Sequence, residues 1–163
     1  MLLKKDRLLN ILPFISAALM FLVFVVSVFG ICFPQTVFDM MKTPGVWRVE
    51  PALKAILIIS KLNYLLMAAL AVISGLRKEF SLKWGIGTAV CTAVLWNSPG
   101  ILGRTLINSI IAHLFGNEQL AIYGILENFS NWFSLFSSLA VLLFISCTAI
   151  EIYCAWKNKK SES

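Results

Sequence analysis

The sequence predicts an all-α integral membrane protein, in which four transmembrane helices form an antiparallel bundle and an amphipathic helix at about 101–116 lies in the outer interface. Two observations predict this class. The 163 residues are 59% hydrophobic and only 13% charged, whereas soluble domains have about 45–50% apolar and about 25% charged residues. The charged residues are also clustered, so that four long stretches contain none: 8–37, 62–76, 84–103 and 128–150.

Four segments match the length of a membrane span. About 20 mostly apolar residues cross the roughly 30 Å hydrocarbon core of a bilayer. The predicted spans are 10–33, 55–76, 82–98 and 130–154. The outer connections are then 34–54 and 99–129, a short tail covers 157–163, and the whole chain, 1–163, is one membrane domain. Because the first apolar stretch is longer than the about 7–15 residues of a signal-peptide core, we read it as a retained span.

Basic residues predict the orientation of these spans. Nine of the fourteen lysines and arginines fall on the side that carries both termini and the connection between the second and third spans. They are Lys4, Lys5, Arg7, Arg77, Lys78, Lys83, Lys157, Lys159 and Lys160. Because basic residues in short connections stay cytoplasmic, we expect both termini to face the cytoplasm, with the chain in a plasma membrane of the bacterial inner-membrane type. The net charge of +6 fits anionic lipid headgroups and gives no reason to expect nucleic acid.

The first outer connection is unusually apolar for a loop. Residues 34–51 are bounded by Pro34, which discourages further helix, and by Pro51. They include apolar side chains such as Phe38 and Trp47. We expect this connection to lie on the outer membrane surface, with Trp47 at the level of the headgroups.

Residues 101–116 have an amphipathic pattern between two helix breakers. At about 100° per residue, polar side chains share one half of a helix and apolar side chains the other. This pattern is typical of a helix that lies flat in the interface, and a short re-entrant helix is the alternative. Arg104 and His113, on the polar half, are candidate contacts to lipid headgroups.

A second outer helix is predicted after Gly116. Asn117 is a favourable N-cap, and Glu118 is favourably placed in the first turn. This helix, 118–129, either runs on into the last span or breaks near 128–131.

Small and polar residues recur at helical spacing along three of the spans. Helices in lipid pack against one another through such residues. The rows are 61, 64, 68, 71 and 75 in the second span, 81, 85, 88 and 92 in the third, and 130, 134, 137, 141, 144, 148 and 151 in the fourth. We expect these rows to meet inside the bundle. A hydrated pathway or a surface for a partner protein are the alternatives.

Five polar residues within or beside the spans are candidate intramembrane contacts. They are Lys61, Asn63, Glu127, Asn131 and Glu151. A charge deep in hydrocarbon costs about 2.5–3.5 kcal/mol on insertion scales, so its depth matters. If the second span begins at Leu57, Lys61 is about 6 Å deep, where it either snorkels to the outer headgroups or pairs with Glu127. Glu151 is equally shallow in the opposite leaflet, so no relay joins it to Lys61.

The sequence contains no pattern for catalysis or for a bound cofactor. The four cysteines form no CxxC motif, and the single histidine, His113, has no ligand partner at metal-binding spacing. We therefore predict no catalytic, cofactor-binding or metal-binding residues and no enzymatic activity.

These features predict a small membrane protein that acts by contact within the lipid bilayer. Its partner would be another membrane protein or a second copy of the chain. An accessory subunit, an assembly factor and an immunity-type protective protein all fit, the last because its layout is similar, in hydropathy alone, to that of immunity proteins against pore-forming bacteriocins. The alternative is an oligomeric transporter or channel component for a small solute or ion. Five residues would supply polarity at the midplane: Thr88, Cys91, Thr92, Ser137 and Ser138.

Overall fold

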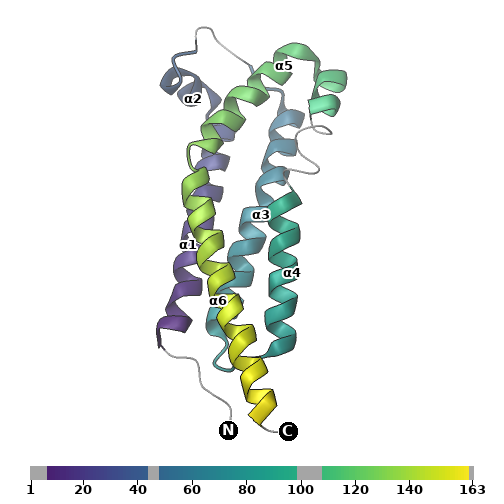
Figure 1. Ribbon diagram of the computed structural model, residues 1–163. Coiled ribbons are helices and arrows are strands. Elements are labelled where there is room, and N and C mark those ends of the chain that lie inside the picture. The colour runs from purple at the N-terminus through teal and green to yellow at the C-terminus, as the bar shows by residue number, and fades with distance from the viewer. Residues whose placement is uncertain (1–6, 44–47, 99–107, 162–163) are drawn as a thin grey trace.

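The described part of the chain is entirely helical. The computed structural model describes residues 7–43, 48–98 and 108–161, which form six α-helices and no β-strand. The helices are α1 (Arg7–Cys32), α2 (Pro34–Met40), α3 (Pro51–Leu76), α4 (Leu82–Ser98), α5 (Asn108–Asn131) and α6 (Ser134–Ser161). Figure 1 shows α1, α3, α4 and α6 side by side as a bundle, with α2 and α5 at one end of it. The predicted all-α class is confirmed for these residues.

The four long helices pack in a ring. α1 packs along α3, α4 lies against both α3 and α6, and α6 returns to α1. Consecutive long helices run in opposite directions, so α1 begins and α6 ends at the same end of the bundle as the α3–α4 connection (Figure 1). We call this the inner end, and the end covered by α2 and α5 the outer end.

Three of the helices are long and apolar enough to cross a membrane: Asn10–Cys32, Pro51–Leu76 and Ser134–Lys157. They correspond to the first, second and fourth predicted spans, and they support a membrane location. The third predicted span is α4, which has 17 residues. At about 1.5 Å per residue α4 is about 25 Å long, which is shorter than the roughly 30 Å hydrocarbon core.

Two helix boundaries differ from the sequence prediction because of local backbone chemistry. α3 begins at Pro51 rather than near 55, because proline in the first turn of a helix loses no hydrogen bond. α6 begins at Ser134 rather than at 130, because α5 runs on to Asn131. A turn then follows, in which the Trp132 N–H donates to the Phe129 carbonyl at 3.1 Å. The second outer helix therefore breaks before the last span.

A glycine divides α5 into two parts. Gly116 has φ 84° and ψ 173°, in the region of positive φ that L side chains rarely adopt. The predicted end of the first outer helix at Gly116 is thus confirmed. Residues 101–107 of that predicted helix lie outside the described residues.

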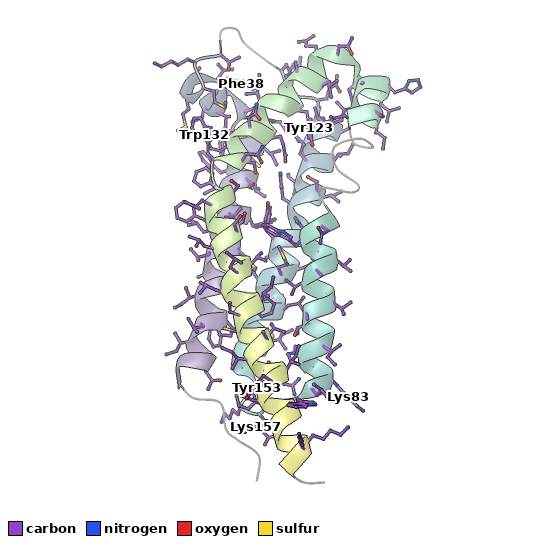
Figure 2. All side chains as sticks on the ribbon, in the orientation of Figure 1. Phe38, Lys83, Tyr123, Trp132, Tyr153 and Lys157 are labelled. Atoms are coloured by element: carbon purple, nitrogen blue, oxygen red, sulfur yellow. The ribbon has the colours of Figure 1, made fainter. Side chains whose placement is uncertain are left out.

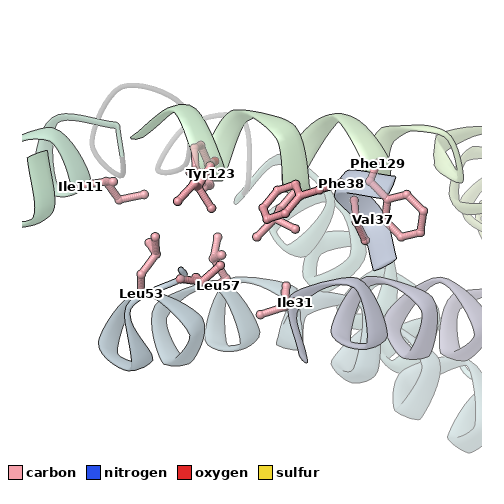
Figure 3. Close-up of a cluster of buried hydrophobic side chains, with 11 residues drawn as sticks. Ile31, Val37, Phe38, Leu53, Leu57, Ile111, Tyr123 and Phe129 are labelled. Atoms are coloured by element: carbon pink, nitrogen blue, oxygen red, sulfur yellow. The ribbon is translucent and has the colours of Figure 1, made fainter. Parts of the chain in front are cut away.

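A hydrophobic cluster fills the outer end between α2, α3 and α5 (Figure 3). It consists of Ile31, Val37, Phe38, Val49, Leu53, Leu57, Ile111, Ile122, Tyr123, Leu126 and Phe129. We call this set the outer core, and we call α2, residues 48–50 and α5 together the outer head. Most members are large side chains, and each is at most 8% exposed.

The outer core includes part of the first outer connection. Residues 34–40 form the helix α2, with Pro34 in its first turn. Val37 and Phe38 are 0% exposed and Val49 is 6% exposed, so these side chains contact protein rather than the membrane surface. The apolar residues of this connection are needed for a core, which is why the loop is so hydrophobic. Trp47 lies outside the described residues.

The bundle has a separate core of smaller side chains. Its buried members are Ala17, Met20, Met67, Ala68, Ala71, Ala140, Val141 and Phe144. Glycines allow the closest approaches between helices: a Cβ at Gly75 would lie 2.8 Å from the Phe14 ring, and one at Gly85 would lie 2.7 Å from Ile152 Cγ1. The predicted small and polar rows are buried along most of their length, whereas Ser134 is exposed.

Candidate functional site

An ion pair joins the bundle to the outer head. Lys61 Nζ of α3 lies 2.8 Å from Glu127 Oε2 of α5, and the two side chains are 10% and 32% exposed. This is one of the two alternatives that the sequence leaves open for Lys61, the other being snorkelling to the headgroups. Because the two charges are only partly open to solvent, each is the other's main compensation, and removing one leaves a poorly solvated charge.

α3 begins before the span from which the depth of Lys61 is counted. Lys61 lies ten residues after Pro51 and fifteen before Leu76, which is about 15 Å from the outer end of the helix and about 22 Å from the inner end. The depth of about 6 Å is counted from Leu57, six residues after the start of the helix. The ion pair is therefore well inside the helical assembly, beneath the outer core.

Further polar contacts surround the ion pair on α3. Tyr64, one turn from Lys61, lies near Ser137 of α6 and is close enough to Glu127 for an electrostatic interaction. Asn63 Nδ2 donates to the Leu95 carbonyl of α4 in a long hydrogen bond of 3.5 Å. This one stretch of α3 thus has polar contacts with α4, α5 and α6.

A second polar contact fixes the outer head, and the sequence analysis did not identify it. Gln119 Nε2 donates to the Arg48 carbonyl at 2.9 Å, and Gln119 Oε1 accepts from the Glu50 N–H at 3.3 Å. The side chain is 7% exposed and holds the backbone of 48–50 against α5. A signal was available, because Gln119 falls in line with Ile122 and the other apolar residues that α5 buries.

The other candidate residues lie apart from the ion pair. Asn131 is exposed at the end of α5, and the buried position next to it is taken by Ser130, whose hydroxyl lies 2.8 Å from that of Ser27 in α1. Glu151 is 2% exposed in the inner half of α6, where it packs beside Gly85 of α4. It is therefore buried at the opposite end of the bundle from Lys61.

Of the two candidate headgroup contacts, Arg104 and His113, the structure describes only one. His113 is exposed in the first part of α5. Arg104 lies outside the described residues. The headgroup role of both stays a prediction.

Two buried threonines of the bundle bond within their own helices. Thr88 Oγ1 donates to the Trp84 and Gly85 carbonyls at 3.0 Å, and Thr148 Oγ1 donates to the Phe144 carbonyl at 2.8 Å. Such bonds satisfy a hydroxyl without linking it to the next helix. These two threonines therefore do not link neighbouring helices by hydrogen bonds.

The described residues hold no candidate metal centre. No group of three or more His, Cys, Asp or Glu side chains within 7–43, 48–98 and 108–161 is placed to hold a metal ion. All four cysteines are free thiols. No protein-family model, curated protein or solved structure matches the chain. Its role is therefore argued from the polar contacts and surfaces alone.

Proposed function

We propose that the chain is a non-enzymatic multi-pass membrane protein that acts by protein–protein contact. α1, α3, α4 and α6 would be four spans, with both termini in the cytoplasm of a bacterial inner membrane and the outer head on the opposite side. The partner would be another membrane protein or a second copy of the chain, as for an accessory subunit, an assembly factor or an immunity-type protein.

The observation that carries this proposal is the construction of the outer head. The head has its own hydrophobic core, and Lys61–Glu127 and Gln119 tie it to the bundle and to the first outer connection. A head held in this way presents one preformed surface, and preformed surfaces bind with a smaller entropic cost than mobile ones.

Exposed apolar side chains on this head suit a contact surface. Leu114 of α5 is 67% exposed and Met40 of α2 is 57% exposed. Large apolar side chains exposed outside the membrane are a common feature of partner-binding sites. The part of α5 before Gly116 would lie in the outer interface, as its amphipathic pattern predicts, so Leu114 would meet a partner at the level of the headgroups.

The shortness of α4 fits a crossing only if the bilayer adapts. A helix about 25 Å long in a core of roughly 30 Å leaves a mismatch of about 5 Å, and bilayers adjust to such a mismatch at a modest cost. The basic residues support a crossing by α4. Lys78 precedes α4 and Lys159 lies at the end of α6, and the two lysines fall on the same side of the membrane only if both helices cross it.

Purification of the tagged chain in a gentle detergent, followed by mass spectrometry of the accompanying proteins, tests the proposal. We expect the parent to recover a partner or a defined oligomer. Leu114→Glu should reduce that recovery, because it places a charge in the apolar surface, whereas Asn117→Glu, at an exposed polar position of the same helix, should not. Recovery of monomer alone from the parent would contradict the proposal.

One observation favours a small-solute or ion pathway as a second candidate. Asn63 Oδ1 and Thr92 Oγ1 are buried and have no hydrogen-bond partner among the described residues, and waters or a solute would supply such partners. Reconstitution in liposomes separates the two candidates. Solute flux that Thr92→Val abolishes would favour the pathway, and the absence of flux would favour the contact role.

A further inference from the structure

An apolar groove runs along the outside of the bundle between α3 and α4. It has a volume of about 480 Å³ and is lined entirely by apolar atoms. Its walls are Leu66, Ala69, Leu70, Ile73, Val90, Cys91, Val94 and Leu95. The groove faces outward from the bundle, so any occupant would come from the surrounding bilayer.

Two rows of residues lead from this groove to the inner end, and each row ends at a basic side chain. On α3 the row is Leu66, Leu70, Ile73 and Arg77, and on α4 it is Val94, Val90, Gly87 and Lys83. Residues at this spacing of three and four share one face of a helix. From Leu66 to Arg77 the row is about 17 Å long, close to one leaflet of a roughly 30 Å core.

Three polar groups lie at the inner end, beyond the groove: those of Arg77, Trp84 and Lys83. The Arg77 guanidinium lies 4.8 Å from the centroid of the Trp84 ring, so it is directed from the end of α3 towards α4. Trp84 Nε1–H is a buried donor without an acceptor in the described part of the chain. Lys83, the preceding residue of α4, is exposed (Figure 2). Of the acidic residues near this end, Glu79 is exposed to solvent and Glu151 packs against α4 from α6.

Gly87 leaves the path between these groups and the groove open. A Cβ at Gly87 would meet no atom within 4 Å, whereas Gly75 and Gly85 are in close contact with other helices. Packing within the bundle therefore does not require a glycine at this position. The absence of a side chain instead keeps the surface between Lys83 and Val90 smooth.

We propose that this groove binds an anionic phospholipid of the cytoplasmic leaflet. Its phosphate is held by Arg77 and Lys83, the Trp84 N–H donates a hydrogen bond to a phosphate or ester oxygen, and one acyl chain lies along the groove. Charge complementarity selects this occupant, because a wholly apolar groove with two cations and an unused donor beyond its inner end matches an anionic head on an apolar chain. The inference rests on the proposed membrane placement.

Lipid binding to the purified full-length chain in detergent micelles tests the inference. Phosphatidylglycerol and phosphatidylcholine with identical acyl chains are titrated and the bound lipid is counted by native mass spectrometry. We expect the parent to prefer phosphatidylglycerol. Removing both charges in Arg77→Gln/Lys83→Gln should weaken phosphatidylglycerol binding roughly 30-fold, because each basic residue near an anionic lipid contributes about 1 kcal/mol. Phosphatidylcholine binding should be unchanged.

Matched variants separate a site from a diffuse basic surface. Lys157→Gln/Lys159→Gln removes the same charge from exposed positions of α6 at the same end of the bundle, and it should retain the preference. Trp84→Phe and Gly87→Leu should each weaken binding, while Gly124→Leu, at a glycine that also has open space around it, should not. Lys83→Gln alone keeps the Arg77–Trp84 contact and guards against misfolding of the double variant.

Three results would overturn the inference. They are equal binding of the two lipids by the parent, an equal loss in the α6 control pair, and a dimer that Gly87→Leu converts to monomer without any effect on lipid, which would assign the groove to a second copy of the chain. Binding in micelles does not depend on orientation in a cell. Its failure would therefore leave the proposed orientation and contact role untouched.

Discussion

The outer head and the bundle are built on different packing rules. The outer core is made of large side chains such as Phe38, Leu53 and Phe129, whereas the bundle core depends on Ala68, Ala71 and other small residues. The outer surfaces differ in the opposite sense. The bundle exposes large Ile, Leu, Val and Phe side chains along its helices, whereas the head exposes charged residues such as Asp39 and Glu118.

The proposed membrane placement, with water around the head and lipid around the bundle, explains this difference. In water, burying apolar area stabilises a fold by about 25 cal/mol per Å², so large side chains belong inside. In lipid that gain is absent, and helices associate through close backbone approach and polar contacts. The head should therefore be sensitive to the loss of large side chains, and the bundle to the gain of them.

Truncation of Phe38 should have the largest effect. Phe38→Ala removes a 0% exposed ring from the outer core, and we expect a loss of about 3–5 kcal/mol in the free energy of unfolding. Chemical unfolding in mixed micelles measures it. Phe33→Ala, at a position that is 56% exposed, is the matched control and should change stability by less than about 1 kcal/mol. Equal effects would mean that the head has no core of its own.

Enlargement of Gly85 should have the next largest effect. Gly85→Val forces a side chain towards Ile152, whose Cγ1 would lie 2.7 Å from a Cβ at this position, and overpacking of this kind costs about 1–3 kcal/mol. The control is Gly87→Val on the same helix, where a Cβ meets nothing within 4 Å. If both variants unfold at the same temperature, α4 does not pack against α6 as described.

The ion pair that joins the two regions should contribute less to the free energy of unfolding, and its two single variants should differ in their loss. Lys61→Leu and Glu127→Leu each strand one charge, and we expect each to lose about 1–2 kcal/mol. Glu127→Leu should cost more, because the lysine that it strands is 10% exposed against 32% for the glutamate. The double variant should recover part of the loss. Purely additive losses in the double-mutant cycle would show that the two residues do not interact.

Loss of the Gln119 amide should have the smallest effect on overall stability. Gln119→Ala removes the contacts to the Arg48 carbonyl and the Glu50 N–H, which together contribute about 1 kcal/mol. Hydrogen exchange should accelerate at residues 48–50 and stay unchanged in α3. Gln35→Ala, which removes an exposed contact to Asp39, serves as the control. Unchanged hydrogen exchange at Glu50 would show that Gln119 does not hold the backbone of 48–50.

The sequence is most informative for features that depend on the residue pattern of a single helix. Hydropathy and spacing predict the long helices and the buried position of Ala71 and Thr92. For Lys61, equal depth offers Glu127 as one of two alternatives, and the structure shows that pair. The apolar side chains of residues 34–40 find partners in α5, far along the chain, and hydropathy alone does not reveal those partners. The role of Gln119 depends on a backbone about 70 residues away, which spacing within one helix does not reveal.

Cysteine labelling in intact cells tests the central claim, that the outer head and both chain ends lie on opposite sides of four spans. In a background with the four native cysteines replaced by alanine, single cysteines are placed as Lys78→Cys, His113→Cys and Lys160→Cys. The account predicts that a membrane-impermeant maleimide labels only the cysteine at 113 until the cells are permeabilised. Labelling at 160 with protection at 78 would mean that α4 does not cross, and would contradict the account.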